Sequence, residues 1–230
     1  MFHKSYTRSA STPSVLLHKS YTRSASPPSV LLHKSYTQAA STPSDINEHL
    51  PTLLSYAQEC NHITECGVRG VTSSWAFALG LAGKSSARLI QVDLNINNNV
   101  TQFGKVAKDN GIDVVFYQQD DLKCPMEETE LLFIDTWHVY AHLKRELERW
   151  NTNVTKFIIM HDTTVDEWLG ETIRNDWNAN EQSLTSGFPV DEIMKGLWPA
   201  IDDFLTSHPH WILEKRFTNN NGLTILKRIA

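Results

Sequence analysis

The sequence has few cysteines, no C-x-x-C pair and no long apolar run, and each shortage excludes a class of protein. Its three cysteines, Cys60, Cys66 and Cys124, argue against a disulfide scaffold and against a cysteine-bound zinc site. No apolar stretch approaches the roughly 20 residues that cross a bilayer. We therefore expect a soluble protein of the cytoplasm, with reduced thiols and no membrane partner.

Basic charge is scarce outside the first 44 residues. That segment holds five Lys and Arg and no acidic residue, so residues 45–230 carry a net charge of −10, against −5 for the whole chain. A protein that binds the phosphate backbone of nucleic acid needs a basic face. We expect no nucleic-acid partner for the acidic part of the chain.

The first 44 residues consist of a 15-residue unit that occurs three times, beginning at His3, His18 and His33. The copies read HKSYTRSASTPSVLL, HKSYTRSASPPSVLL and HKSYTQAASTPSDIN. They are rich in Ser, Thr and Pro, show no lasting helical or strand periodicity, and are too short to bury a core. We predict that residues 1–44 are disordered and that residues 45–230 form one domain.

Beyond residue 45, short apolar runs alternate with helical patterns, which predicts an α/β fold with a doubly wound, mostly parallel sheet. A last pair of strands around the turn at 218–222 predicts an antiparallel end to this sheet. A helical pattern at 190–205 contains Pro199, where we expect an interruption. The expected strands are 62–66, 87–93, 113–117, 131–135, 156–161, 211–217 and 223–228, and the expected helices are 74–82, 100–109 and 140–150.

Residues 63–82, ITECGVRGVTSSWAFALGLA, have the pattern of a strand, a glycine-bearing turn and a helix. The strand ends at Glu65, the turn contains Gly67 and Gly70, and Ser73 lies where the helix begins, so hydroxyls and free amides gather there. The next strand ends at Asp93, whose carboxylate can accept both hydroxyls of a ribose. The sequence thus predicts a site for a nucleotide-like ligand.

The glycine turn favours one kind of nucleotide over another. A dinucleotide-binding turn has the pattern G-x-G-x-x-G, and here Arg69 occupies the place of the middle glycine. Glu65 would repel a diphosphate, whereas it suits a ligand with a cationic amino group, such as S-adenosylmethionine. A dinucleotide oxidoreductase and a glycine turn without any ligand remain the alternatives.

Acidic residues follow every parallel strand of the predicted sheet, where ligands of such sheets bind. A lone acid there is most often a helix cap, but several together favour a site. Two of them, Asp135 and Asp162, could hold Mg²⁺, which takes one or two carboxylates with water and substrate oxygens. The full set is Glu65, Asp93, Asp120, Asp121, Asp135 and Asp162.

Two histidines accompany these acids. His138 lies three residues after Asp135, where an imidazole can take the proton of a hydroxyl that binds the metal. His161 adjoins Asp162 at the end of a buried strand, so a packed structural histidine is at least as good an interpretation as a base. Aromatic residues are frequent in the same half of the chain and could stack on a sugar, although core packing is their usual role.

Several segments between residues 44 and 230 resemble class I S-adenosylmethionine-dependent methyltransferases. The resemblance is strongest to the sugar O-methyltransferase group often labelled cephalosporin-hydroxylase-like, which includes methyltransferase domains attached to the glycan-building enzymes of large DNA viruses. The segments are ITECGVRGVTSSWAF, VDLN, LLFIDTWHVYAHLKRELERW, KFIIMHDT, GLWPAIDDFL and TNNNGLTILKR.

The resemblance implies a Rossmann-like sheet and transfer of a methyl group from S-adenosylmethionine to a hydroxyl of a deoxysugar or glycan. It also implies roles for the residues at the strand ends. Val71 departs from the family pattern, because many members have a loop glycine there, and Thr163 stands where some metal-dependent members have a further ligand. The implied roles are cofactor binding for Glu65, Gly67, Arg69, Gly70, Ser73, Asp93, Asp120 and Asp121, metal binding for Asp135 and Asp162, and catalysis for His138 with Asp135.

A different class of function also fits these residues. A non-catalytic cofactor-binding domain, whose repeats recruit partners, would keep Glu65 and Asp93 but would be indifferent to the loss of His138. Binding without turnover therefore distinguishes this alternative from the methyltransferase.

Overall fold

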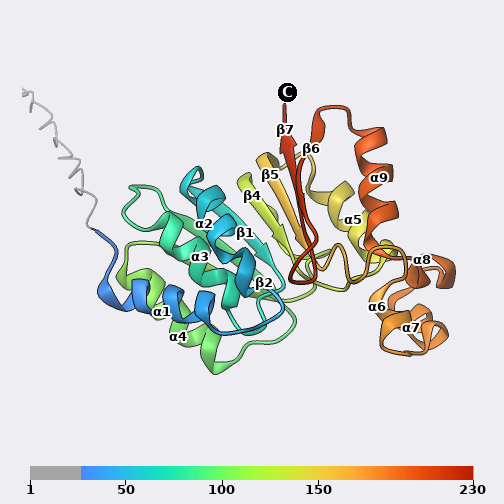
Figure 1. Cartoon of the computed structure of the whole chain (residues 1–230), viewed down its shortest axis with the longest axis horizontal. Coiled ribbons are helices and arrows are strands. Elements are labelled where there is room, and N and C mark those ends of the chain that lie inside the picture. Colours follow the sequence, from blue (N-terminus) through green and yellow to red (C-terminus); the bar gives the residue numbers. More distant parts are fainter. Residues whose placement is uncertain (1–26, 230) are drawn as a thin grey trace, which may run out of the picture.

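The strands form one seven-stranded sheet in the order β3-β2-β1-β4-β5-β7-β6 in the computed structural model, which describes residues 27–229 (Figure 1). Strands β1 to β5 are parallel, and β7 is antiparallel to both of its neighbours. This confirms the predicted α/β fold with an antiparallel end. The strands are β1 (His62–Cys66), β2 (Arg88–Asp93), β3 (Asp113–Gln118), β4 (Thr129–Ile134), β5 (Val154–His161), β6 (Trp211–Phe217) and β7 (Leu223–Arg228).

Helices cover both faces of the sheet, and so its central strands are apolar on both sides. In β4, Leu131 and Phe133 join one core, whereas Leu132 and Ile134 join the other. The first core is covered by α1 (Val30–Ser41), α2 (Leu50–Gln58), α3 (Thr72–Leu81) and α4 (Asn98–Asp109), and the second by α5 (Tyr140–Trp150) and α9 (Leu197–Ser207). The shorter η1 (Asn47–His49), α6 (Glu171–Arg174), α7 (Ala179–Ser186) and α8 (Val190–Met194) complete the described part.

The strand order brings the loops after the central strands together. The chain runs outward from β1 to β3 and then returns to β4 on the other side of β1. At such a reversal the loops that follow the two central strands diverge and leave a crevice at the carboxyl edge of the sheet. The predicted site residues lie at this edge.

The boundaries of the predicted strands and helices agree with the structure to within two residues. One detail differs. The helical pattern at 190–205 breaks at Lys195 and Gly196, and Pro199 lies in the first turn of α9. Proline is tolerated there because the amides of a first turn have no partner within the helix.

Residues 30–41 form helix α1, and the expectation of disorder throughout residues 1–44 is wrong for this part. The Ser29 side chain caps the helix by accepting a hydrogen bond from the amide of Leu32, which is fully buried against the first core. Tyr36 and Ala40 pack on the same core, four and eight residues further on. This apolar stripe crosses the boundary between two repeats, so it is not visible in either unit alone.

Residues 1–26, which contain the rest of the repeats, lie outside the described residues. None of the helices between residues 27 and 229 has the length and apolar character that a membrane span requires.

Candidate functional site

The loop after β1 lies against the end of β4, and only glycine fits at its first position. Gly67 has φ +85°, and a Cβ atom there would lie 1.9 Å from the carbonyl oxygen of Asp135. The Gly67 amide donates to the carbonyl of Val92, and the Asp135 amide donates to that of Cys66. The ends of β1, β2 and β4 are therefore tied together at the site.

Asp93 connects the end of β2 to the same loop. Its Oδ2 accepts hydrogen bonds from the amides of Val68 and Arg69, each at 2.9 Å, and its Oδ1 accepts one from the amide of Asn95. The Arg69 side chain points to Asp45, with 2.6 Å between Nη2 and Oδ2. The loop is thus folded around the carboxylate that the sequence predicts as a ribose ligand.

Val71 occupies a backbone conformation that favours glycine. Its φ is +62°, in the left-handed region, which is costly for a β-branched residue. Val71 is also the position where the resemblance leads one to expect a glycine. Val71 therefore has the left-handed backbone conformation of the expected glycine although it carries a side chain. At Gly70, by contrast, a Cβ atom would meet no close neighbour.

Glu65 is enclosed beneath the first turn of α3. Ser73 Oγ donates to its Oε1 at 2.6 Å, and Ser74 Oγ and Gln91 Nε2 donate to its Oε2 at 2.7 and 2.8 Å. Burial raises the pKa of Glu65 to about 7, against the lowering effect of these three donors. This corrects the expectation that Glu65 and Ser73 contact the ligand, because both side chains are buried and bonded to each other. Their role is to hold the start of α3 on the sheet.

The His138 imidazole lies among four carboxylates at the carboxyl ends of β4 and β5. Its Nε2 is 3.1 Å from Oδ1 of Asp135. Its Nδ1 is 3.1 Å from Oδ2 of Asp162, 3.4 Å from Oδ2 of Asp166 and 3.6 Å from Oε2 of Glu171. The structure therefore brings together the three predicted residues His138, Asp135 and Asp162.

These charges control the protonation of the site. Burial opposes the charged form of His138, but the hydrogen bonds to Asp135 and Asp166 outweigh it and raise the pKa of His138 well above its ordinary value. Burial also opposes ionisation of Asp135, yet hydrogen bonds from His138 and His161 lower its pKa. In this arrangement an imidazolium is held by carboxylates.

His161 belongs to the framework of the site. Its Nδ1 is 3.3 Å from Oδ1 of Asp135, and its Nε2 is 3.0 Å from the carbonyl oxygen of Asp45 and 3.2 Å from that of Asn220. Both ring nitrogens face acceptors, and the side chain is buried. Of the two interpretations that the sequence left open, the packed structural histidine fits.

Two groups of side chains here have the spacing of metal ligands. Asp135, His161 and Asp162 form one, and His138, Asp162 and Asp166 form the other, with ligand atoms within 4.8 Å of one another in each. Oδ1 of Asp162 is buried and has no hydrogen-bond partner among residues 27–229. It lies 3.5 Å from Nδ1 of His161, and a buried carboxylate oxygen without a hydrogen bond is costly, so the donor set fits a divalent cation.

Sequence reasoning missed Asp166 and Glu171. Asp166 is fully buried and binds the Arg174 guanidinium through both carboxylate oxygens, at 2.7 and 2.9 Å. The only available signal was its place four residues after Asp162 in HDTTVDEW. Glu171 begins α6, and its amide donates to the carbonyl of His138.

Asp120 and Asp121 do not join the other acids. Asp120 Oδ1 accepts from the Leu122 amide, and its Oδ2 pairs with Lys123. Asp121 is buried, and its Oδ1 lies 3.1 Å from Nε2 of His142 on α5. The prediction that Asp121 contacts the cofactor is therefore corrected, because its side chain points into the second core region.

The sequence matches no protein-family profile and no curated protein. Solved structures share its fold at low sequence identity. The O-methyltransferase TomG of Streptomyces achromogenes, in complex with S-adenosylmethionine, is 12% identical, with a TM-score of 0.58 over 88% of this chain and 91% of that one. An O-methyltransferase of Bacillus cereus in complex with S-adenosylhomocysteine is 16% identical, with a TM-score of 0.55 over 88% and 92%.

The Podospora anserina methyltransferase PaMTH1, bound to S-adenosylhomocysteine, is 14% identical, with a TM-score of 0.52 over 87% of this chain and 88% of that one. The shared feature of these matches is the arrangement of the whole sheet and its helices, since each covers nearly the full length of both chains. The chain has the Rossmann-like fold of these methyltransferases.

Proposed function

We propose that this protein is an S-adenosylmethionine-dependent O-methyltransferase that methylates a hydroxyl of a sugar, either a deoxysugar such as rhamnose or a glycan. His138 is the base, and a divalent cation such as Mg²⁺ assists. The observation that carries the proposal is the contact of His138 with Asp135 and Asp162, beside the glycine loop and Asp93. The fold shared with O-methyltransferases bound to this cofactor or its product supports it.

We place the cofactor against the loop of Gly67, Arg69 and Gly70, which is folded around Asp93. Asp93 already accepts three amide hydrogen bonds, yet an ionised carboxylate has about four lone-pair sites. One site is therefore left for a ribose hydroxyl on the carboxylate that shapes the loop. The sulfonium of the cofactor supplies a methyl group that is already activated for displacement.

The carboxylates of Asp135 and Asp162, which belong to one group with the spacing of metal ligands, are the proposed metal ligands. A divalent cation at these residues would lower the pKa of an alcohol bound to it. Carboxylates that bind a cation no longer stabilise a charged imidazole, and so His138 can release its proton and act as a base.

The chain's own contribution to the reaction is alignment and proton removal. The acceptor oxygen forms a bond to the methyl carbon as the carbon–sulfur bond breaks, and the hydroxyl proton passes to His138. Correct alignment of the two reactants is worth roughly 7–11 kcal/mol. A positioned base contributes a further ~10²–10⁴-fold. Asp135 orients the imidazole through its contact with Nε2.

Exposed aromatic side chains support a sugar acceptor. Trp168 and Trp177 are largely exposed, and they flank Glu171, whose amide binds the carbonyl of His138. Sugars place their apolar faces on such rings. Tyr140 is buried, and Trp198 stacks against the Arg216 guanidinium at 3.9 Å, so neither is free for this role.

The proposal is tested by incubating the full chain with methyl-labelled S-adenosylmethionine and a panel of free and glycan-linked sugars, with and without a chelator. We expect label in a sugar and a large loss of rate with chelator. A thermal-shift assay in parallel compares S-adenosylmethionine, its demethylated product and NAD. Stabilisation by the first two without any labelled product would favour the binding-only alternative, and stabilisation by NAD alone would refute the methyltransferase.

A further inference from the structure

A second group of ligand-type side chains lies next to the proposed active site. His142 and Glu146 are four residues apart on α5 and so share one helix face, and Asp121 reaches them from the segment after β3. Their ligand atoms all lie within 4.8 Å of one another. No residue of this group belongs to the set around His138.

The group contains two buried carboxylates, and among the described residues their basic neighbour within ion-pair distance is His142. Glu146 is 1% exposed and Asp121 is 8% exposed, and among the described residues neither carboxylate lies within ion-pair distance of a Lys or Arg. Oε2 of Glu146 and Nδ1 of His142 are buried and have no hydrogen-bond partner in the described part of the chain. Burial and the neighbouring Asp121 raise the pKa of Glu146 well above its ordinary value, and carboxylates buried in this way are normally protonated, paired or bound to a metal ion.

The distances are close to those of a metal site. Nε2 of His142 is 3.1 Å from Oδ1 of Asp121 and 3.9 Å from Oε1 of Glu146. Ligand atoms at the usual bond lengths of a tetrahedral zinc site lie about 3.3–3.5 Å apart. The two distances from His142 lie on either side of this range, and the carboxylates of Asp121 and Glu146 are within 4.8 Å of each other.

We propose that Asp121, His142 and Glu146 bind a divalent transition-metal ion of the Zn²⁺ type, separate from the metal of the active site. One imidazole and two carboxylates suit Zn²⁺ better than Mg²⁺, which takes oxygen ligands. The proposal does not depend on the methyltransferase activity, because it concerns a site with its own ligands.

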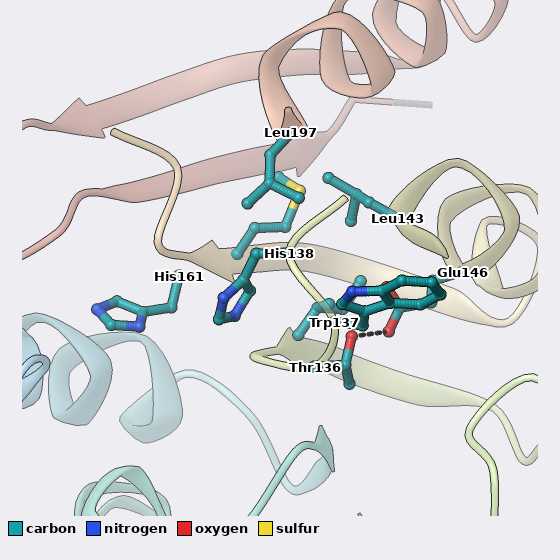
Figure 2. Close-up of a pocket in the computed structure, with 9 residues that line it drawn as sticks. Thr136, Trp137, His138, Leu143, Glu146, His161 and Leu197 are labelled. Atoms are coloured by element: carbon teal, nitrogen blue, oxygen red, sulfur yellow. Dashed lines mark hydrogen bonds between the residues drawn. The ribbon is translucent and has the colours of Figure 1, made fainter. Parts of the chain in front are cut away.

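The ion would hold the loop that carries the catalytic residues. Thr136 Oγ1 donates to Oε1 of Glu146 at 2.8 Å, and Thr136 directly follows Asp135. Figure 2 shows this hydrogen bond beneath the Trp137 ring. Thr136 and Glu146 line a small cavity of about 10 Å³ together with His138 and His161. A metal on Glu146 would therefore fix α5 and this loop to the segment after β3, which makes its ligands positioning residues.

The main alternative is a proton shared between Asp121 and Glu146. The Glu146→Gln variant distinguishes the metal site from the shared proton. Glutamine has the same size as glutamate and can donate a hydrogen bond to Asp121 as a protonated glutamate does, but it is a poor metal ligand. His142→Gln is a second variant that removes the imidazole and leaves both carboxylates. All measurements use the full chain with Asp135→Asn and Asp162→Asn, which disables the first site.

After chelator treatment and dialysis, this background protein is titrated with Zn²⁺, and bound metal and the melting temperature are measured. We expect the background protein to bind one equivalent of Zn²⁺ and its melting temperature to rise. In Glu146→Gln and His142→Gln the affinity for Zn²⁺ should fall by at least about 10-fold, and the rise in melting temperature should be lost. Co²⁺ should give the visible absorption of a nitrogen and oxygen site.

Failure of the background protein to bind Zn²⁺ would overturn the proposal, and so would equal binding by the Glu146→Gln variant. A thiolate-to-Co²⁺ charge-transfer band would do the same, because it would assign the metal to Cys66 or Cys124. These results leave the proposed methyl transfer untouched, since they measure neither the cofactor nor turnover.

Discussion

Nε2 of His138 lies 3.1 Å from Oδ1 of Asp135, the carboxylate that follows β4. The same oxygen lies 3.3 Å from Nδ1 of the structural His161, so Asp135 fixes the imidazole from a rigid position. The cofactor loop lies against the Asp135 backbone at Gly67, whereas the proposed base contacts the Asp135 carboxylate. Loss of the base and loss of the cofactor should therefore be experimentally separable.

His138→Ala should abolish the acceleration that a positioned base provides, which is ~10²–10⁴-fold in kcat. The affinity for S-adenosylmethionine should change by less than about twofold, because the loop and Asp93 are intact. Isothermal titration and the labelled-methyl assay measure the two quantities. His33→Ala, on the exposed side of α1, is the control. Turnover by the His138→Ala protein at the wild-type rate would remove His138 from the mechanism.

Asp93→Ala should weaken cofactor binding. The change removes the proposed ribose contact and three hydrogen bonds that shape the loop. Hydrogen bonds to charged groups are worth about 1.5–3 kcal/mol each, so we expect the dissociation constant for S-adenosylmethionine to rise by at least about 10-fold. Asp109→Ala, at the exposed end of α4, should bind the cofactor normally. An unchanged dissociation constant in Asp93→Ala would show that the ribose binds elsewhere.

Gly67→Ala should damage the site far more than Gly70→Ala, although the two glycines are only three residues apart. At Gly67 the new Cβ would lie 1.9 Å from the Asp135 carbonyl oxygen, and φ is +85°. At Gly70 the nearest atom is Thr72 Oγ1 at 3.9 Å. We expect Gly67→Ala to lose at least about 2 kcal/mol of stability and most cofactor affinity, and Gly70→Ala to change little. Equal melting temperatures for the two variants would contradict the loop geometry.

The sequence was sufficient for the sheet and for the residues at its carboxyl edge. Apolar runs of strand length that end on Asp93, Asp135 or Asp162 place these side chains at one edge whatever the details of packing, because parallel strands share their direction. The position of His138 can be inferred in the same way, because it lies three residues beyond Asp135. Such inferences need only the strand pattern and the chain direction.

The surroundings of Glu65, Asp121 and Asp166 depend on packing that the sequence does not display. Glu65 ends a strand like the other acids, but α3 crosses over it and its two serines satisfy the carboxyl group. Asp121 is drawn away by His142, a contact that only the docking of α5 creates. Asp166 comes from the irregular segment after β5, where no periodicity indicates which side chains turn inward.

The pH dependence of stability should report on Glu65. Its pKa rises from 4.5 to about 7 on folding because it is buried, so the folded state favours the protonated carboxyl. This contribution is fully present below about pH 4.5 and is lost as the pH rises through 7. Glu65→Gln should remove the dependence, and at pH 8 it should be up to about 3 kcal/mol more stable than wild type.

Chemical denaturation of both proteins between pH 4.5 and 8 measures this difference. The exposed Glu59→Gln variant should follow the wild-type curve. A Glu65→Gln protein that becomes less stable than wild type as the pH rises from 5 to 8 would mean that the three donors, and not burial, dominate at this residue.

Leu32→Ala should show that α1 is an integral part of the domain. Leu32 is fully buried among residues of the first core, whereas its neighbour Leu31 is 57% exposed. Truncation of a buried leucine costs about 2–5 kcal/mol, because it loses both the transfer free energy and the packing around it. Leu31→Ala is a matched control on the same helix, with the same change in helix propensity, and should cost little.

Urea denaturation of the two variants gives the comparison directly. If Leu32→Ala cost no more than Leu31→Ala, α1 would not be packed on α3 in solution, and residues 30–41 would be disordered as the sequence predicts. If instead only Leu32→Ala lowers the free energy of unfolding, the repeat region contributes to the folded domain, because the helix joins the end of one repeat to the start of the next.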